Sequence, residues 1–156
     1  MIPKEKCSIL VPGCGNSSLS ADLTNDGYGS VTSIDWSEIC IENMREKDPK
    51  GIYEVMNVED LAYEDGSFDL VIAKGVVDSI ICGENSVHAV AKALHEFERV
   101  LTDNGVLICV SYGSPDQRQW HFEGKVEHEF SWRFDWVTIP KPKIPSMDAT
   151  TKDDLG

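Results

Sequence analysis

Short apolar runs alternate along the chain with stretches in which apolar residues recur every three or four positions. Five runs are apolar at nearly every position and are bounded by glycine, asparagine, aspartate or proline. This pattern is typical of strands that are buried on both faces of a sheet. We therefore expect strands at 8–11, 31–34, 53–56, 68–73 and 106–112.

The stretches between these runs have the spacing of helices that bury one face. The first helix is expected at 17–24. The second follows Ser37, whose hydroxyl can accept a hydrogen bond from the first turn, and continues through Glu46. The longest spans 87–101, and the Asn-Gly pair at 104–105 is the expected stop at its C-terminus.

The resulting order, β-α-β-α-β-β-α-β, predicts an α/β fold with a doubly wound, mostly parallel sheet flanked by helices. A chain of 156 residues, 41% of them hydrophobic, is long enough for one such core. We expect one domain over 1–142 and a flexible polar tail over 143–156. Within the domain, the aromatic-rich segment 130–139 is expected to form a strand beside the fifth strand.

Two glycines, Gly13 and Gly15, lie directly between the first expected strand and the first helix. Glycine there lets the backbone turn sharply and approach a ligand closely. The second strand ends in Asp35, where a carboxylate can accept hydrogen bonds from a ribose diol. These features fit a dinucleotide or S-adenosylmethionine (SAM). The dinucleotide fingerprint requires a third glycine where this chain has Ser18, and this difference favours SAM.

Charge and cysteine content narrow the range of partners. The chain has 27 acidic and 14 basic residues and a net charge of −13 at pH 7. Most of its surface therefore repels nucleic acid phosphates and attracts a basic protein. The five cysteines lack the spacing of a metal site or a disulfide framework, and no apolar run is long enough to span a bilayer. We expect a cytoplasmic protein that binds no metal, membrane or nucleic acid.

Four segments carry a more specific signal, in this order: ILVPGCGNSSLSADL, VTSIDWS, VMNVEDLAYEDGSFDLVIAKGVVDSI and ALHEFERVLTDNGVLICVSYGSP. Together they resemble the class I SAM-dependent methyltransferases. The GCGNS loop and the KGxxD motif are similar to those of the branch that includes the lysine methyltransferases of translation elongation factor 1-alpha (eEF1A). The resemblance extends from Ile9 to Pro142. It implies a Rossmann-like fold, SAM as cofactor and methyl transfer to a lysine of a protein such as eEF1A, in a chain without the family's N-terminal lid and final strand.

The resemblance also assigns the cofactor site. It places the methionine end of SAM against the glycine loop, the ribose hydroxyls on the acidic end of the second strand, and adenine against the residues that follow the second and third strands. The residues implied are Gly13, Cys14, Gly15, Asn16, Asp35, Trp36, Asn57 and Val58. Asn57 stands where the family usually has aspartate, but its side-chain oxygen can still accept from the adenine amino group.

The transfer site is implied at the end of the fourth strand. Lys74 and Gly75 are expected beside the transferred methyl group, and Asp78 is expected to orient the incoming amine or, alternatively, to cap a helix. Lys74 and Asp78 are thus the candidate catalytic residues. Arg118 and His121 follow the fifth strand, where this fold places loops that contact substrate.

Three functions stay open at this point. The chain is interpreted as a protein-lysine methyltransferase, with a non-catalytic SAM-fold binding module or inactive fragment as the first alternative and a nicotinamide-dependent oxidoreductase as the second. Without a final strand, the fifth strand is left with an open edge. We therefore expect a monomer or a dimer paired along that edge.

Overall fold

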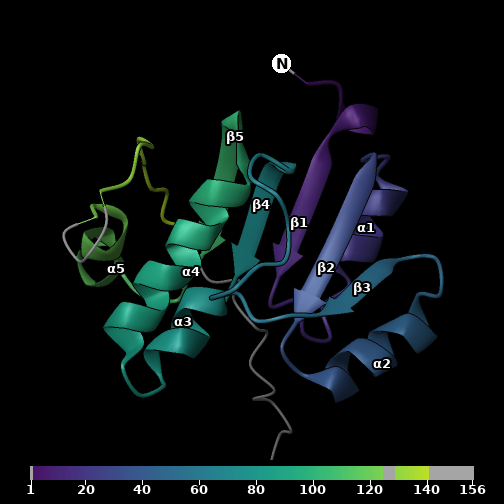
Figure 1. Ribbon diagram of the computed structural model, residues 1–156, viewed down its shortest axis with the longest axis horizontal. Helices are drawn as coiled ribbons and strands as arrows, with labels where there is room; N and C mark the ends of the chain where they lie inside the picture. Colours follow the sequence, from purple (N-terminus) through teal and green to yellow (C-terminus); the bar gives the residue numbers. More distant parts are fainter. Residues whose placement is uncertain (1, 125–128, 141–156) are drawn as a thin grey trace, which may run out of the picture.

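The computed structural model describes residues 2–124 and 129–140 (Figure 1). Five strands, β1 (Ser8–Pro12), β2 (Ser30–Asp35), β3 (Ile52–Val55), β4 (Phe68–Lys74) and β5 (Leu101–Val110), form one sheet in the order β3-β2-β1-β4-β5. All four neighbouring pairs are parallel. The strand order reverses between β1 and β4, so the doubly wound parallel sheet predicted from the sequence is confirmed.

Helices cover both faces of this sheet. They are α1 (Leu19–Asn25), α2 (Glu38–Lys47), α3 (Val76–Ile81), α4 (Ser86–Val100) and α5 (Pro115–Phe122), preceded by a short 3-10 helix over Lys4–Lys6. In Figure 1, α1 and α2 accompany β1, β2 and β3, whereas α3, α4 and α5 lie toward β4 and β5. Within the described residues, no helix is long and apolar enough to cross a membrane.

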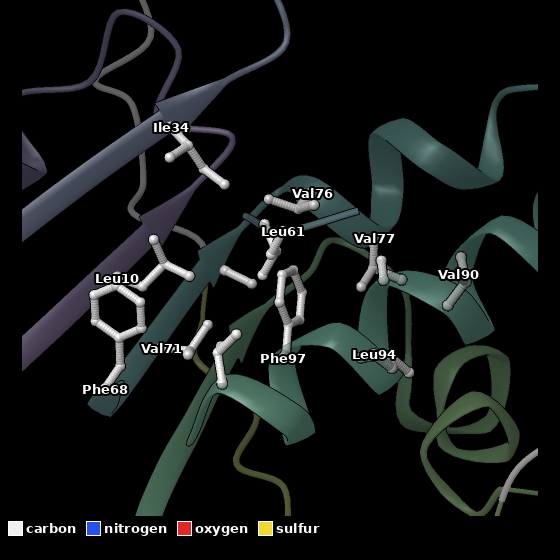
Figure 2. Close-up of a cluster of buried hydrophobic side chains, with 13 residues drawn as sticks. Leu10, Ile34, Leu61, Phe68, Val71, Val76, Val77, Val90, Leu94 and Phe97 are labelled. Carbon is white, nitrogen blue, oxygen red and sulfur yellow. The ribbon is translucent and has the colours of Figure 1, made fainter. Parts of the chain in front are cut away.

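The core has two halves because alternate strand residues face opposite sides of the sheet. On one side, Leu94 and Phe97 of α4 pack with Leu10 and Val71 of the sheet (Figure 2). On the other side, a second cluster joins Ile9, Val11 and Ile72 of the strands to Ile41 and Met44 of α2 and to Cys14, Val31 and Tyr53. A sheet held from both faces is a rigid base for the loops at its carboxyl edge.

The longest helix ends within one residue of its predicted end, but the stop signal predicted for it is wrong. α4 stops at Val100, and the Asn-Gly pair at 104–105 lies inside β5. The register jumps there, because Phe68 pairs with Leu101 while Leu70 pairs with Val106. The extra β5 residues bulge out of the ladder. The Asn-Gly pair is therefore part of a bulge within the strand and does not end a helix.

The predicted strand at 130–139 is also wrong, because this segment has no strand structure. The N–H and hydroxyl of Ser131 donate to Oε1 of Glu98 over 2.6 and 2.8 Å, and the indole N–H of Trp132 donates to the carbonyl of Phe122 over 3.2 Å. Phe130 and Trp132 pack against the core. These contacts are with α4 and α5, so the segment does not extend the sheet beside β5. The tail predicted at 143–156 lies outside the described residues.

Two helices, α3 and α5, were not predicted. α5 has a recognisable start, since Ser114 and Gln117 form a capping box and Pro115 occupies the first turn. α3 follows β4 with Gly75 as the sole intervening residue, in the left-handed region at φ +75°. Both helices begin at the carboxyl edge of the sheet.

Candidate cofactor and acceptor site

The residues expected to bind a cofactor come from different strands but meet at one edge. Because the sheet is parallel, the carboxyl ends of all its strands point the same way. The glycine loop follows β1, Asp35 ends β2, Asn57 and Val58 follow β3, and Lys74 ends β4. The topology thus places all the sequence-predicted site residues along the carboxyl edge.

Gly13 and Gly15 share a backbone conformation that favours glycine but differ in what surrounds them. Gly13 and Gly15 have φ values of +58° and +52°, a region that side chains with a Cβ rarely adopt. A Cβ on Gly13 would lie 2.8 Å from Cγ2 of Val76, so Gly13 lets the loop pack on α3. A Cβ on Gly15 would meet no atom within 4 Å. The loop is therefore anchored at Gly13 and faces open space at Gly15.

Asp35 is fixed by the backbone on both sides of it. Its Oδ2 accepts the N–H of Gly15 over 3.0 Å, and its Oδ1 accepts the N–H of Ser37 over 3.0 Å. The residue is 8% exposed, yet each oxygen keeps a second lone pair for a further donor. Its backbone carbonyl accepts the N–H of Met56 over 3.0 Å, which joins it to the end of β3. This carboxylate is held in one orientation before any ligand arrives.

Three of the remaining candidates lie exposed at this edge. Trp36, directly after Asp35, is 81% exposed. Asn16 and Asn57 are exposed as well, and Oδ1 of Asn57 accepts the N–H of Glu59 over 3.1 Å. Val58 is half-buried and packs against the core. An open edge with an aromatic ring and amide groups around a fixed carboxylate can receive a nucleoside.

Cys14 lies between the two glycines and is buried in the core. Burial raises the pKa of its thiol to about 12, and the negative charge of Asp35 adds to this effect. The thiol therefore stays protonated near neutral pH, as suits a small packing residue. All five cysteines are free of disulfides. Within the described residues, no group of three His, Cys, Asp or Glu side chains could hold a metal ion.

The end of β4 forms the other part of the site. Lys74 is exposed, and the N–H of Gly75 donates to the carbonyl of Val110 over 2.8 Å, which ties the ends of β4 and β5 together. Asp78 lies in the first turn of α3 and forms an ion pair with Arg118, with 2.9 Å between Oδ1 of Asp78 and Nη2 of Arg118. Burial alone would raise the pKa of Asp78, but hydrogen bonds from Ser111, Tyr112 and Arg118 outweigh it and lower this pKa.

Sequence reasoning missed two residues here, Ser111 and Gly113. The Ser111 hydroxyl donates to Oδ1 of Asp78 over 2.6 Å and accepts from Nε of Arg118 over 3.0 Å. The capping signature at Ser114 predicts a helix that starts directly after this turn, although it does not identify their contacts. It places Arg118 on the first turns of a helix that starts at this turn, within reach of the end of β4.

The residues present fit SAM on structural grounds. The open space at Gly15 leaves room for a ligand beside the loop backbone. The fixed carboxylate of Asp35 is suited to a ribose diol. A pyrophosphate would need a closer approach at the third-glycine position, where Ser18 instead stands just before α1 with its hydroxyl donating to Asp22 over 2.7 Å.

Comparison with solved structures agrees with this fold. A SAM-dependent methyltransferase from Methanosarcina mazei superposes with a TM-score of 0.66 at 24% identity, covering 78% of this chain and 60% of that one. A protein from Pyrococcus horikoshii superposes with a TM-score of 0.59 at 29% identity, covering 66% of this chain and 48% of that one.

Comparison with characterised proteins identifies the family. The chain is 35% identical over 139 residues to mouse EEF1A lysine methyltransferase 4, covering 82% of this chain and 52% of that protein. It is 33% identical over 156 residues to mouse eEF1A lysine and N-terminal methyltransferase, covering 96% of this chain and 21% of that protein. The chain thus spans about half the length of the first relative. Residues 10–109 match the family model described as a methyltransferase domain. The chain therefore belongs to the methyltransferase domain family, with the class I SAM-dependent methyltransferase fold and eEF1A lysine methyltransferases among its relatives.

Proposed function

We propose that this domain transfers a methyl group from SAM to a lysine side chain of a basic protein, with eEF1A as the first candidate. The observation that carries the proposal is the unit formed by Gly15 and Asp35, a glycine backbone facing open space beside a fixed carboxylate. The names of the two mouse relatives support the choice of acceptor.

The cofactor would lie along the carboxyl edge from β1 to β3. Its methionine end would follow the loop of Gly13, Cys14, Gly15 and Asn16, and its ribose hydroxyls would bind Asp35. Its adenine would lie between the exposed ring of Trp36 and the residues Asn57 and Val58 after β3. This order of contacts follows the order β1, β2, β3 in the sheet.

Bound SAM supplies a methyl group that is already activated by its sulfonium. The chain must then mainly align a neutral amine with that group and exclude water around it. A free lysine amine has a pKa near 10.4, and desolvation in the site lowers it. Lys74 and Gly75 would line the transfer position at the end of β4, and Asp78 would act on the acceptor side. A dedicated base is not required.

The chain's acidity supports the choice of a basic protein as acceptor. A net charge of −13 attracts a basic surface and disfavours nucleic acid.

We further propose a cytoplasmic protein that is a monomer or an edge-paired dimer. In the part of the chain that the structure describes, β5 pairs with β4 alone, and Val106, Ile108 and Val110 are exposed along it. Size-exclusion chromatography with light scattering distinguishes the two states.

The direct test is a pair of measurements on the purified chain. Calorimetric titration with SAM and with NAD⁺ is expected to give binding of SAM alone. Incubation with eEF1A and methyl-labelled SAM, followed by mass spectrometry, is expected to give label on a lysine. SAM binding without transfer to any lysine would favour the non-catalytic module, and binding of NAD⁺ alone would favour the oxidoreductase.

A further inference from the structure

Arg118 is held by two neighbours at once. Its Nε donates to the hydroxyl of Ser111 over 3.0 Å, and its Nη2 donates to Oδ1 of Asp78 over 2.9 Å. The two charged side chains are 20% and 19% exposed, so much of the pair is shielded from water. A planar guanidinium that reaches two acceptors in this way is fixed more firmly than a lysine ammonium would be.

The carboxylate of Asp78 is engaged at both oxygens. Oδ1 accepts from the Ser111 hydroxyl over 2.6 Å as well as from Arg118. Oδ2 accepts the backbone N–H of Tyr112 over 2.9 Å. A carboxylate with this many donors favours its ionised form and is a poor acceptor for a further proton. Asp78 is thus placed to hold the turn after β5 rather than to take a proton from a substrate.

Gly113 shows that the turn is shaped around the cation. A Cβ on Gly113 would lie 2.4 Å from Cζ and 2.5 Å from Nε of Arg118. Its N–H donates to Oγ of Ser111 over 3.1 Å. The backbone therefore passes directly against the guanidinium, and the absence of a side chain at this position is what allows the contact.

This cluster lies toward the β5 end of the carboxyl edge, whereas the unit of Gly15 and Asp35 lies at the ends of β1 and β2. The cluster joins the first turn of α3, the turn after β5, and α5, whereas Gly15 lies in the loop after β1 and Asp35 ends β2. Within the described residues, the hydrogen bonds of Asp78 and Arg118 stay inside the turn, α3 and α5. Lys74 and Gly75, at the proposed transfer position, lie between the two groups along the edge.

We propose that Asp78, Ser111 and Arg118 form a clamp that positions the acceptor side of the site, with Arg118 as a positioning residue that fixes the 111–114 turn against α3. The inference rests on the proposed function for the identity of the acceptor. It separates the site into a cofactor half, organised by Asp35, and an acceptor half, organised by Arg118. Loss of the clamp should alter use of the acceptor and leave cofactor binding unchanged.

The matched control is Arg99, which forms a comparable network far from this edge. Its Nη2 donates to Glu96 and its Nη1 to Asp65, each over 2.8 Å. It also donates to the carbonyls of Tyr63 and Leu61, which fixes the segment that precedes β4. Arg118→Met and Arg99→Met each remove one fork of hydrogen bonds, but only the first touches the acceptor side. Arg118→Lys keeps the charge without the fork.

The first readout is amide hydrogen exchange at Tyr112 and Gly113, measured by NMR on the full chain. Both N–H groups donate within the clamp. We expect Arg118→Met to speed their exchange about tenfold or more, Arg118→Lys to restore part of the protection, and Arg99→Met to leave them unchanged. Ser111→Ala provides a second variant if Arg118→Met does not fold. Unchanged exchange at both amides in whichever variant folds would overturn the clamp.

The second readout is methylation kinetics on eEF1A together with SAM titration. We expect kcat/KM for eEF1A to fall about tenfold or more in Arg118→Met while the Kd for SAM stays within about twofold. Arg99→Met should change neither at a temperature where it is folded. A parallel loss of SAM affinity would overturn the division into two halves. If the wild-type chain does not methylate eEF1A, the proposed function fails, and the exchange measurement still decides the clamp.

Discussion

The backbone N–H of Gly15 donates to Oδ2 of Asp35 over 3.0 Å. This bond joins the loop after β1 to the last residue of β2, so the glycine loop and the acidic residue behave as one unit. Ser37, at the start of α2, holds the other carboxylate oxygen. A ligand that binds Asp35 therefore meets a carboxylate whose orientation is already set, which lowers the entropy lost on binding.

Asp35→Ala should weaken SAM binding at least about tenfold. Two hydrogen bonds to a charged acceptor are together worth more than about 1.4 kcal/mol, and the loop loses its anchor as well. Isothermal titration calorimetry measures the effect. Asp22→Ala is the control. Asp22 lies in α1 and its carboxylate accepts an exposed hydrogen bond from the Ser18 hydroxyl, so this variant should keep wild-type affinity for SAM. Equal affinity in the Asp35 variant would remove the ribose assignment.

Gly13 and Gly15 should respond differently to substitution. Gly15→Val should abolish SAM binding without unfolding the chain, because the side chain fills open space that the ligand needs. Gly13→Ala should lower the melting temperature, because its Cβ collides with Val76, and Val76→Ala in the same chain should recover part of the loss. Each variant also carries a strain of about 1–3 kcal/mol at positive φ. Calorimetry measures the loss of SAM binding in Gly15→Val, and thermal unfolding measures the loss of stability in Gly13→Ala. Normal SAM binding by the Gly15→Val chain would contradict the placement of SAM beside Gly15.

The sheet, and with it the meeting of the candidate residues at its carboxyl edge, was predictable from sequence because buried parallel strands are apolar on both faces. Ile9, Leu10 and Val11 illustrate this, since two face one cluster and one faces the other. The N-cap at Ser37 was also predicted correctly, as its hydroxyl accepts the N–H of Cys40. The position of Asp35 at the end of the second strand then followed from the order of the elements.

The cluster of Asp78, Ser111 and Arg118 was less predictable because its contacts join residues that are distant in sequence. The bond between Asp78 and Arg118 spans 40 positions, and no local sequence pattern around either residue indicates the other as its partner. Segment 130–139 is a second case in which contacts distant in sequence outweigh the local pattern. Its aromatic residues suggested a strand, but tertiary contacts with Glu98 and Phe122 decided its conformation.

Binding of the basic acceptor should weaken as salt rises toward about 0.5 M, because exposed charge pairs are then screened within a few ångströms. The net charge of −13 makes this attraction long-ranged at low salt. The KM for eEF1A measured across a salt series tests it, with the Kd for SAM as the internal control. A salt-independent KM, or a neutral small molecule as the sole methylated product, would contradict the proposed acceptor.

Mild acid should destabilise the chain through His121. This side chain lies buried on α5 with its ring centroid 3.7 Å from that of Trp120. Burial lowers the pKa of His121 from its usual 6.5, and the positive charge of Arg118 lowers it further. The folded chain thus binds the proton less readily than the unfolded chain does. The stability from neutral His121 is complete above pH 6.5 and decreases as pH falls from 6.5 toward the lowered value.

His121→Gln tests this, because glutamine has no titration in this range. The urea midpoint of unfolding should decrease between pH 7.5 and pH 5.5, and this decrease should be larger in the wild-type chain than in the variant. Asp78 does not account for such a difference, since its pKa is lowered from 3.8 and the carboxylate stays ionised across this range. Parallel losses in the two chains would place the acid sensitivity elsewhere. A smaller loss in the variant would mean that protonation acts at α5, the helix that carries Arg118.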